Sequence, residues 1–144
     1  MKNNLQIAAI QFDIKWELKQ ENLRIIEKYL DKISNTDIVL LPEMFTTGFT
    51  MQAKKFSENM DGETIQWMKL WSKKLDSAIG GSIIISDRDE IYNRFVFVTP
   101  ESEIFFYDKR HTFTLANENK YYTKGNNLGI FDYKGWKICL RICY

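Results

Sequence analysis

The strongest constraint on the fold is a regular alternation between short apolar runs and segments of helical periodicity. Residues 5–11, 38–41 and 78–86 are apolar runs of strand length, as expected for strands buried within a sheet. Between them, residues 17–34 and a segment that begins near Gly62 carry apolar side chains at three- and four-residue intervals, which is typical of amphipathic helices. The order β-α-β-α-β predicts an α/β fold with helices on at least one face of the sheet.

The second half of the chain predicts consecutive strands instead of further helices. Four runs of strand character follow, at residues 91–99, 103–107, 128–133 and 136–143. The short turns between the members of each pair indicate two hairpins and hence a mixed sheet. The polar segment 108–127 between the hairpins has no clear period. Loops of that length are usually functional, so we expect this segment to contribute to a site.

The chain ends at Tyr144, directly after the predicted strand 136–143. Domains seldom end at the tip of a core strand, because the edge of the sheet would be left open. With 144 residues the chain is long enough for one domain or part of one. We therefore expect residues 1–144 to be the N-terminal portion of a single larger domain.

Composition and charge exclude several classes of protein. Hydrophobic residues make up 44% of the chain and aromatic residues 15%, which is ample for a core and excludes disorder. Twenty Lys and Arg against nineteen Asp and Glu create no strong field that would capture nucleic acid. No apolar stretch approaches the ~18–20 residues of a membrane span, and the N-terminus lacks a signal-peptide profile. We expect a cytoplasmic protein that binds neither nucleic acid nor membrane.

The two cysteines and the single histidine favour neither a disulfide nor a metal. Cys139 and Cys143 lie four residues apart in the predicted strand 136–143, on the same face but too far apart to bridge. These two thiols and His111, without a close-spaced pair of ligands, do not make a structural zinc site. Reduced thiols are therefore expected.

Several residues at predicted strand ends could carry chemistry. Cys143 is either a nucleophile or a buried structural cysteine, and the structural role is favoured for Cys139. Glu43 is either a general base or a helix cap or solvated loop residue. Lys109 either stabilises an oxyanion or belongs to a surface charge run. His111 is the single histidine of the chain, so any Cys–His mechanism would have to use it. The motifs of serine hydrolases, P-loops and dinucleotide-binding folds are missing from the sequence.

Four short sequence motifs, taken in order along the chain, resemble those of the nitrilase superfamily of carbon–nitrogen hydrolases. They are residues 7–11 (IAAIQ), 40–45 (LLPEMF), 107–113 (YDKRHTF) and 141–144 (RICY). Residues 42–49 and 107–111 look most like the omega-amidase branch, whose members hydrolyse the terminal amide of short 2-oxo acids such as 2-oxoglutaramate. The resemblance implies the N-terminal part of an αββα sandwich, with a mixed sheet and the helices on the outside. It also implies a small-molecule amide substrate, no metal or organic cofactor, and a homodimer or higher homo-oligomer.

The resemblance also implies a role for each matching residue. Cys143 would be the nucleophile, Glu43 the general base in place of His111, and Lys109 the oxyanion stabiliser. The supporting residues would be Glu118 beside the lysine, the backbone N–H of Tyr144 as a second oxyanion donor, Phe45 and His111.

Two alternatives stay open at this point. The chain could act on another substrate of the superfamily, as another amidase, an N-carbamyl amidohydrolase or a nitrilase. It could also be an inactive half-domain that works only in association, because superfamily members continue after the Cys-Tyr word into further strands, helices and pocket wall. Groups that would bind the carboxylate of the substrate are expected beyond residue 144.

Overall fold

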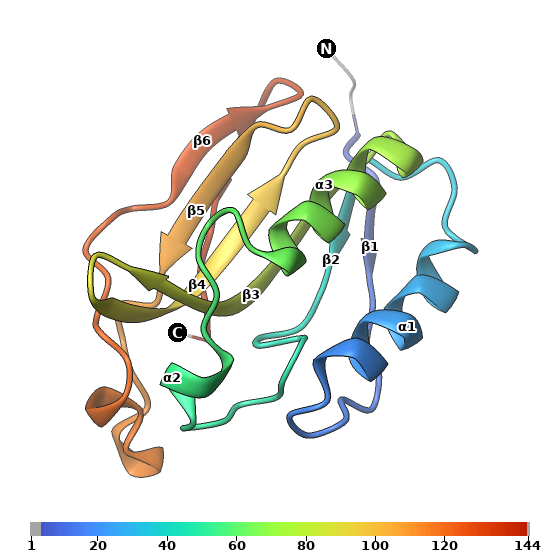
Figure 1. Ribbon diagram of the computed structural model, residues 1–144. Coiled ribbons are helices and arrows are strands. Elements are labelled where there is room, and N and C mark those ends of the chain that lie inside the picture. The colour runs from blue at the N-terminus through green and yellow to red at the C-terminus, as the bar shows by residue number, and fades with distance from the viewer. Residues whose placement is uncertain (1–3, 144) are drawn as a thin grey trace.

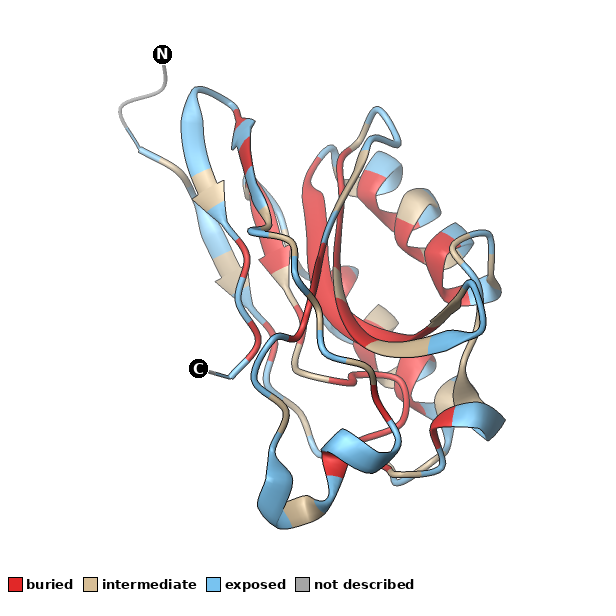
Figure 2. Ribbon diagram, turned by 90° about the vertical axis from the view of Figure 1, so that its left-hand side faces the viewer, coloured by how far each residue is buried: buried red, intermediate tan, exposed pale blue. Residues whose placement is uncertain are grey.

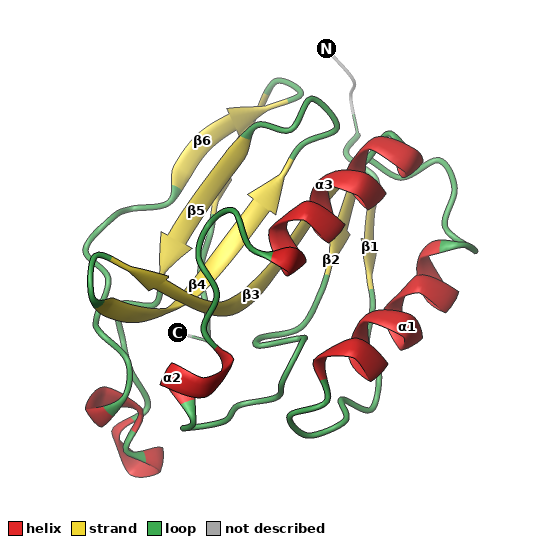
Figure 3. Ribbon diagram, in the orientation of Figure 1, coloured by secondary structure: helices red, strands yellow, loops and turns green. Residues whose placement is uncertain are grey.

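A computed structural model describes residues 4–143 and contains two sheets and three α-helices in that part of the chain (Figures 1 and 3). The elements in chain order are β1 (Ile7–Ala9), α1 (Lys19–Leu30), β2 (Ile38–Leu40), α2 (Ala53–Phe56), α3 (Glu63–Leu75), β3 (Ala78–Asp87), β4 (Glu90–Val98), β5 (Ile104–Asp108), the 3-10 turns η1 (Thr114–Ala116) and η2 (Glu118–Lys120), β6 (Ile130–Tyr133) and β7 (Trp136–Cys139).

The larger sheet is mixed and its strands lie in chain order, from β1 to β5. The strands β1, β2 and β3 are parallel neighbours, whereas β4 is antiparallel to β3 and β5 is antiparallel to β4. This arrangement follows from the connections, because helices α1 and α3 cross between parallel strands while short turns join the antiparallel ones. The predicted α/β fold with a mixed sheet is confirmed.

One face of this sheet is covered by α1 and α3 (Figure 1). The buried residues of α1 include Leu23, Ile26 and Leu30, which share one side of the helix through their three- and four-residue spacing. They pack with Ile65 and Met68 of α3 against apolar side chains of β2, β3 and β4 in one cluster. Burial of this face is the main source of stability for the two helices.

The opposite face is covered by the two-stranded sheet β6–β7. Phe131 and Tyr133 of β6 pack against Phe97 of β4, with ring centroids 5.0 and 5.3 Å apart. Lys134 in the β6–β7 turn also pairs with the buried Asp37 just before β2, at 2.8 Å. Figure 2 shows the buried strands of the larger sheet lying between the helices and this hairpin, so the described residues form three layers.

The largest difference from the sequence prediction is at the last strand. The predicted strand 136–143 is wrong at its end, since β7 stops at Cys139. Leu140 and Ile142 are buried while Arg141 and Cys143 are exposed, so an irregular segment reproduces the alternation of a strand. Cys143 therefore does not lie at the end of a strand, and it does not share a strand face with Cys139.

Smaller differences concern loops. The segment after residue 42, predicted as a loop, contains the single-turn helix α2, which is too short to leave a periodic signal. The polar segment 108–127 contains η1 and η2. In the described part of the chain, no helix combines the length and the apolar character needed to cross a membrane.

Candidate functional site

Glu43 lies in a tight turn that leaves the sheet directly after β2. The next residue, Met44, has a φ of 48°, a left-handed conformation that is uncommon outside glycine. The turn is fixed on β3, because the Met44 N–H donates to Ser82 Oγ at 2.8 Å and the Phe45 N–H donates to the Ser82 carbonyl at 3.3 Å. The sheet thus holds the Glu43 carboxylate at its edge.

Lys109 follows β5 and extends the β4–β5 ladder by one hydrogen bond, from its N–H to the Asn93 carbonyl at 2.9 Å. Its side chain is only 2% exposed. The ammonium donates to Glu43 Oε1 at 2.7 Å and lies 3.1 Å from Glu118 Oε2. Lys109 is therefore a buried bridge between two carboxyl groups, and its assignment to a surface charge run is wrong.

Glu118 begins η2 and is completely buried. Its Oε2 accepts a hydrogen bond from the Phe113 N–H at 2.5 Å, and its own N–H donates to the Phe113 carbonyl at 3.2 Å. These two bonds close the turn that separates Phe113 from Glu118. The polar segment 108–127 consequently brings Lys109, Phe113 and Glu118 to one place.

Asn93 of β4 is a fourth member of this cluster, and sequence reasoning missed it. Its amide donates to Glu43 Oε1 at 2.7 Å and to Glu118 Oε1 at 3.4 Å. Asn93 and Arg94 are both buried although they are neighbours in a strand, where successive side chains point to opposite faces. Two adjacent polar residues inside the apolar run 91–98 were the available signal.

The electrostatics of the cluster favour a charged lysine. Burial alone would lower the pKa of Lys109, but the hydrogen bond and charge of Glu43, followed by those of Glu118, outweigh burial and raise it. Lys109 Nζ also lies 4.9 Å from the centroid of the Phe49 ring, a favourable cation–π arrangement. The ammonium is thus stabilised from several sides and is protonated at neutral pH.

Cys143 shares a cavity of about 230 Å³ with Glu43 and Lys109, and two aromatic residues, Phe49 and Phe113, complete its lining. The cysteine has a φ of 61°, so a non-glycine residue adopts a left-handed conformation here too. Strain of this kind costs about 1–3 kcal/mol and is often found at functional sites. Residues that carry a thiol, a carboxylate and an ammonium therefore line one small, largely apolar space.

Other predicted site residues lie elsewhere. Phe45 is fully buried in the helix-side core, where its ring lies 6.2 Å from that of Trp67, and it does not line the cavity. His111 is exposed and is also not part of the lining. Tyr144 lies outside the described residues, so its backbone N–H stays a prediction.

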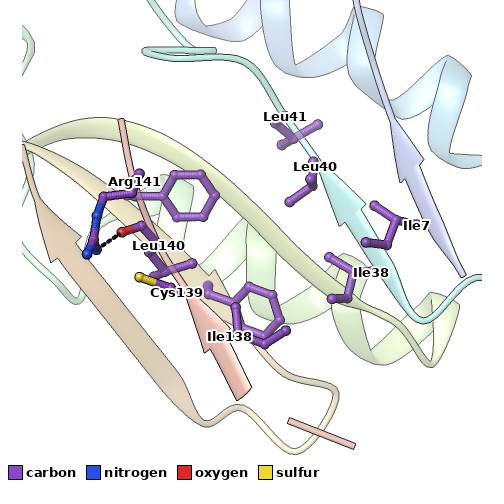
Figure 4. Close-up of a pocket in the computed structure, with 10 residues that line it drawn as sticks. Ile7, Ile38, Leu40, Leu41, Ile138, Cys139, Leu140 and Arg141 are labelled. Carbon is purple, nitrogen blue, oxygen red and sulfur yellow. Dashed lines mark hydrogen bonds between the residues drawn. The ribbon is translucent and has the colours of Figure 1, made fainter. Parts of the chain in front are cut away.

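Cys139 is exposed and not buried as expected. It lines a different, apolar pocket of about 280 Å³ between β7 and strands β1, β2 and β4 of the larger sheet, where Figure 4 shows it beside Leu140 and opposite Ile7 and Leu40. The two cysteines thus have distinct surroundings. Within residues 4–143, no group of three His, Cys, Asp or Glu side chains is arranged to hold a metal ion.

Comparison with known proteins identifies the family. A sequence profile described as "Carbon-nitrogen hydrolase" matches residues 6–144. The chain belongs to the carbon–nitrogen hydrolase family. The resemblance noted from the sequence is thereby confirmed.

Named relatives of this family are similar over nearly the whole chain. The omega-amidase YafV of Yersinia enterocolitica is 38% identical over 99% of the chain and 55% of its own length. The 2-oxoglutaramate amidase of Bacillus subtilis is 32% identical over 96% of the chain and 55% of its own length. The chain thus spans about half the length of these curated relatives.

A solved structure of the family supports the same fold. XC1258 of Xanthomonas campestris, a CN-hydrolase superfamily protein with an arsenic adduct in its active site, aligns with a TM-score of 0.93 at 33% identity. The alignment covers 97% of this chain and 53% of the other. The carbon–nitrogen hydrolase fold of this chain is therefore shown by sequence and by structure.

Proposed function

We propose that the protein is a thiol amidase that hydrolyses the terminal amide of a small 2-oxo acid such as 2-oxoglutaramate. The observation that carries this proposal is the shared cavity of Cys143, Glu43 and Lys109. A nucleophile, a base and a cation are the three groups that amide hydrolysis through a thioester requires. The names of the two relatives, omega-amidase and 2-oxoglutaramate amidase, support the choice of substrate.

In the proposed reaction, Glu43 takes the proton of the Cys143 thiol while sulfur attacks the amide carbonyl carbon. Lys109 then stabilises the negative oxygen of the tetrahedral intermediate. The intermediate collapses to a thioester as Glu43 returns the proton to the leaving ammonia. Water, deprotonated by Glu43, attacks the thioester; Glu43 returns that proton to the departing thiol, and the carboxylic acid product releases its own proton to solvent and leaves as the carboxylate.

Glu118 has a supporting part in this proposal. It does not line the cavity, yet its carboxylate lies 3.1 Å from the Lys109 ammonium. It therefore holds the cation in place and keeps it charged, so that a donor is aimed in advance at the developing oxyanion.

The test is ammonia release from 2-oxoglutaramate by the full-length protein, with Cys143→Ala as the critical variant and Cys139→Ala as its matched control. We expect Cys143→Ala to abolish turnover and Cys139→Ala to retain it, because Cys139 lines a different pocket. Retained turnover in Cys143→Ala would refute the mechanism. Faster hydrolysis of a simple nitrile or an N-carbamyl amine would keep the mechanism but change the substrate class.

A further inference from the structure

Asn93 contacts all three charged residues of the cluster. Among residues 4–143, it is the residue that hydrogen-bonds to Glu43, Lys109 and Glu118 together. Its side-chain amide donates to both carboxylates, and its main-chain carbonyl accepts the Lys109 N–H at 2.9 Å. One strand residue therefore sets the relative positions of three charged groups.

The orientation of the Asn93 amide follows from chemistry. Ionised carboxylates can only accept hydrogen bonds, so the NH₂ end of the amide must face Glu43 and Glu118. The opposite end, Oδ1, is then buried without a hydrogen-bond partner among the described residues. An unpaired buried acceptor is destabilising, and leucine, of similar volume, would not bring that cost to this position.

The two oxygens of Glu43 differ because of these contacts. Oε1 accepts from the Lys109 ammonium and from the Asn93 amide, both at 2.7 Å. Oε2 receives no hydrogen bond from the described part of the chain, although Glu43 lines the cavity together with Cys143. Two donors on one oxygen fix the carboxylate plane and leave the other oxygen available.

We infer that Asn93 is a positioning residue which, with Lys109, holds Oε1 of Glu43 so that Oε2 is the atom that exchanges a proton with Cys143. The S–H bond of Cys143 breaks as the O–H bond on Oε2 forms, and the same proton later moves to the leaving nitrogen. Only the second transfer, from Oε2 to the leaving nitrogen of the amide, rests on the proposed function. The first transfer can be measured without any substrate.

The experiment measures the rate of Cys143 alkylation by iodoacetamide as a function of pH. The full-length protein carries Cys139→Ser, so that Cys143 is the cysteine that remains among residues 4–143. Asn93→Leu removes both amide donors at nearly constant volume. Asn127→Leu is the matched control, because within residues 4–143 the side chain of Asn127 hydrogen-bonds only to main-chain atoms of Phe106 and Asp108. Circular dichroism establishes that each variant is folded.

Asn93→Leu should move the acidic limb of the alkylation profile to higher pH by about one unit, because the proposed proton acceptor of the Cys143 thiol loses one of the two hydrogen-bond donors on its Oε1. The charged groups around Glu43 stay the same: Lys109 contacts Glu43 directly, and Glu118 contacts the other side of the Lys109 ammonium. Asn93→Asp should move the limb further in the same direction, since it adds a third carboxylate to the cluster. This variant is the second test if Asn93→Leu does not fold. Asn127→Leu should leave the limb in place.

An unmoved limb in folded Asn93→Leu, or an equal shift in Asn127→Leu, would overturn the inference. In Asn93→Leu and Asn93→Asp, kcat for amide hydrolysis should fall about tenfold with little change in KM, and part of the loss should be restored at higher pH. Wild-type protein that shows the expected alkylation profile but releases no ammonia would refute the proposed function alone. Normal turnover with an unmoved limb would refute the role of Asn93 alone.

Discussion

Replacement of Lys109 with methionine should lower both the stability and the turnover of the protein, by amounts that the structure allows to be estimated. Methionine keeps most of the side-chain volume and removes the ammonium that contacts Glu43 at 2.7 Å and Glu118 at 3.1 Å. Removing one partner of a buried ion pair costs about 3–5 kcal/mol, because the remaining charge is uncompensated. Glu118 is fully buried and incurs this cost, whereas the Glu43 side chain is 32% exposed and is partly screened by solvent. We therefore count one buried partner and not two.

The same substitution removes the donor proposed for the oxyanion. Loss of one such donor costs about 2.7–4 kcal/mol, or roughly 10²–10³ in kcat. Urea unfolding followed by tryptophan fluorescence measures the stability, and ammonia release measures the turnover. Both quantities should fall in Lys109→Met.

Lys134→Met separates the two effects. Lys134 also pairs with a buried carboxylate, that of Asp37 at 2.8 Å, but it lies in the β6–β7 turn and outside the cavity. This control should lose stability and keep kcat. Wild-type kcat in Lys109→Met, or an equal loss of kcat in Lys134→Met, would show that the Lys109 ammonium is not the oxyanion donor.

Three other perturbations probe the surroundings of the cluster. Arg94→Leu should destabilise the fold by about 3–5 kcal/mol in urea unfolding, since Arg94 forms two hydrogen bonds with buried Asp108 at 2.6 and 2.9 Å; wild-type stability would contradict this. The pKa of Lys109 is raised above 10.5, so the stability that Lys109 contributes should be complete below pH 10.5 and lost as pH rises through the folded-state pKa. The difference in unfolding free energy between wild type and Lys109→Met should therefore persist at neutral pH, and a difference that disappears near neutral pH would contradict this. Gly81→Ala should cost about 1–3 kcal/mol in thermal unfolding, because a Cβ there would lie 2.8 Å from Phe45 Cδ1; an unchanged Tm would mean that the contact relaxes freely.

The arrangement of strands and helices could be predicted from the sequence because periodicity reports which side chains are buried. The helix-side positions Leu23, Ile26 and Leu30 are buried as their spacing predicts. The same reasoning failed at residues 140–143, where the chain leaves the sheet but still alternates between buried and exposed side chains. Alternation reports burial, and it does not report whether a neighbouring strand is present.

The candidate site could be predicted only in part, for a related reason. Glu43, Lys109 and Cys143 lie in words that resemble a known family, and the structure brings all three to one cavity. Asn93 lies in the middle of a strand, and its contacts with Glu43 and Glu118 join residues that are 50 and 25 positions away. Such contacts depend on the register of β3, β4 and β5, which a single sequence does not specify. Phe45 shows the converse, because it lies next to the cluster in sequence and yet its ring is buried in the core.

The proposed mechanism depends on a thioester between Cys143 and the acyl group of the substrate. The most direct measurement is intact-mass spectrometry of full-length protein quenched with acid during turnover of 2-oxoglutaramate, followed by peptide mapping. We expect one acyl group, equal in mass to the substrate minus ammonia, on the peptide that contains Cys143. An adduct on Cys139, or turnover that persists in Cys143→Ala without any adduct, would contradict it.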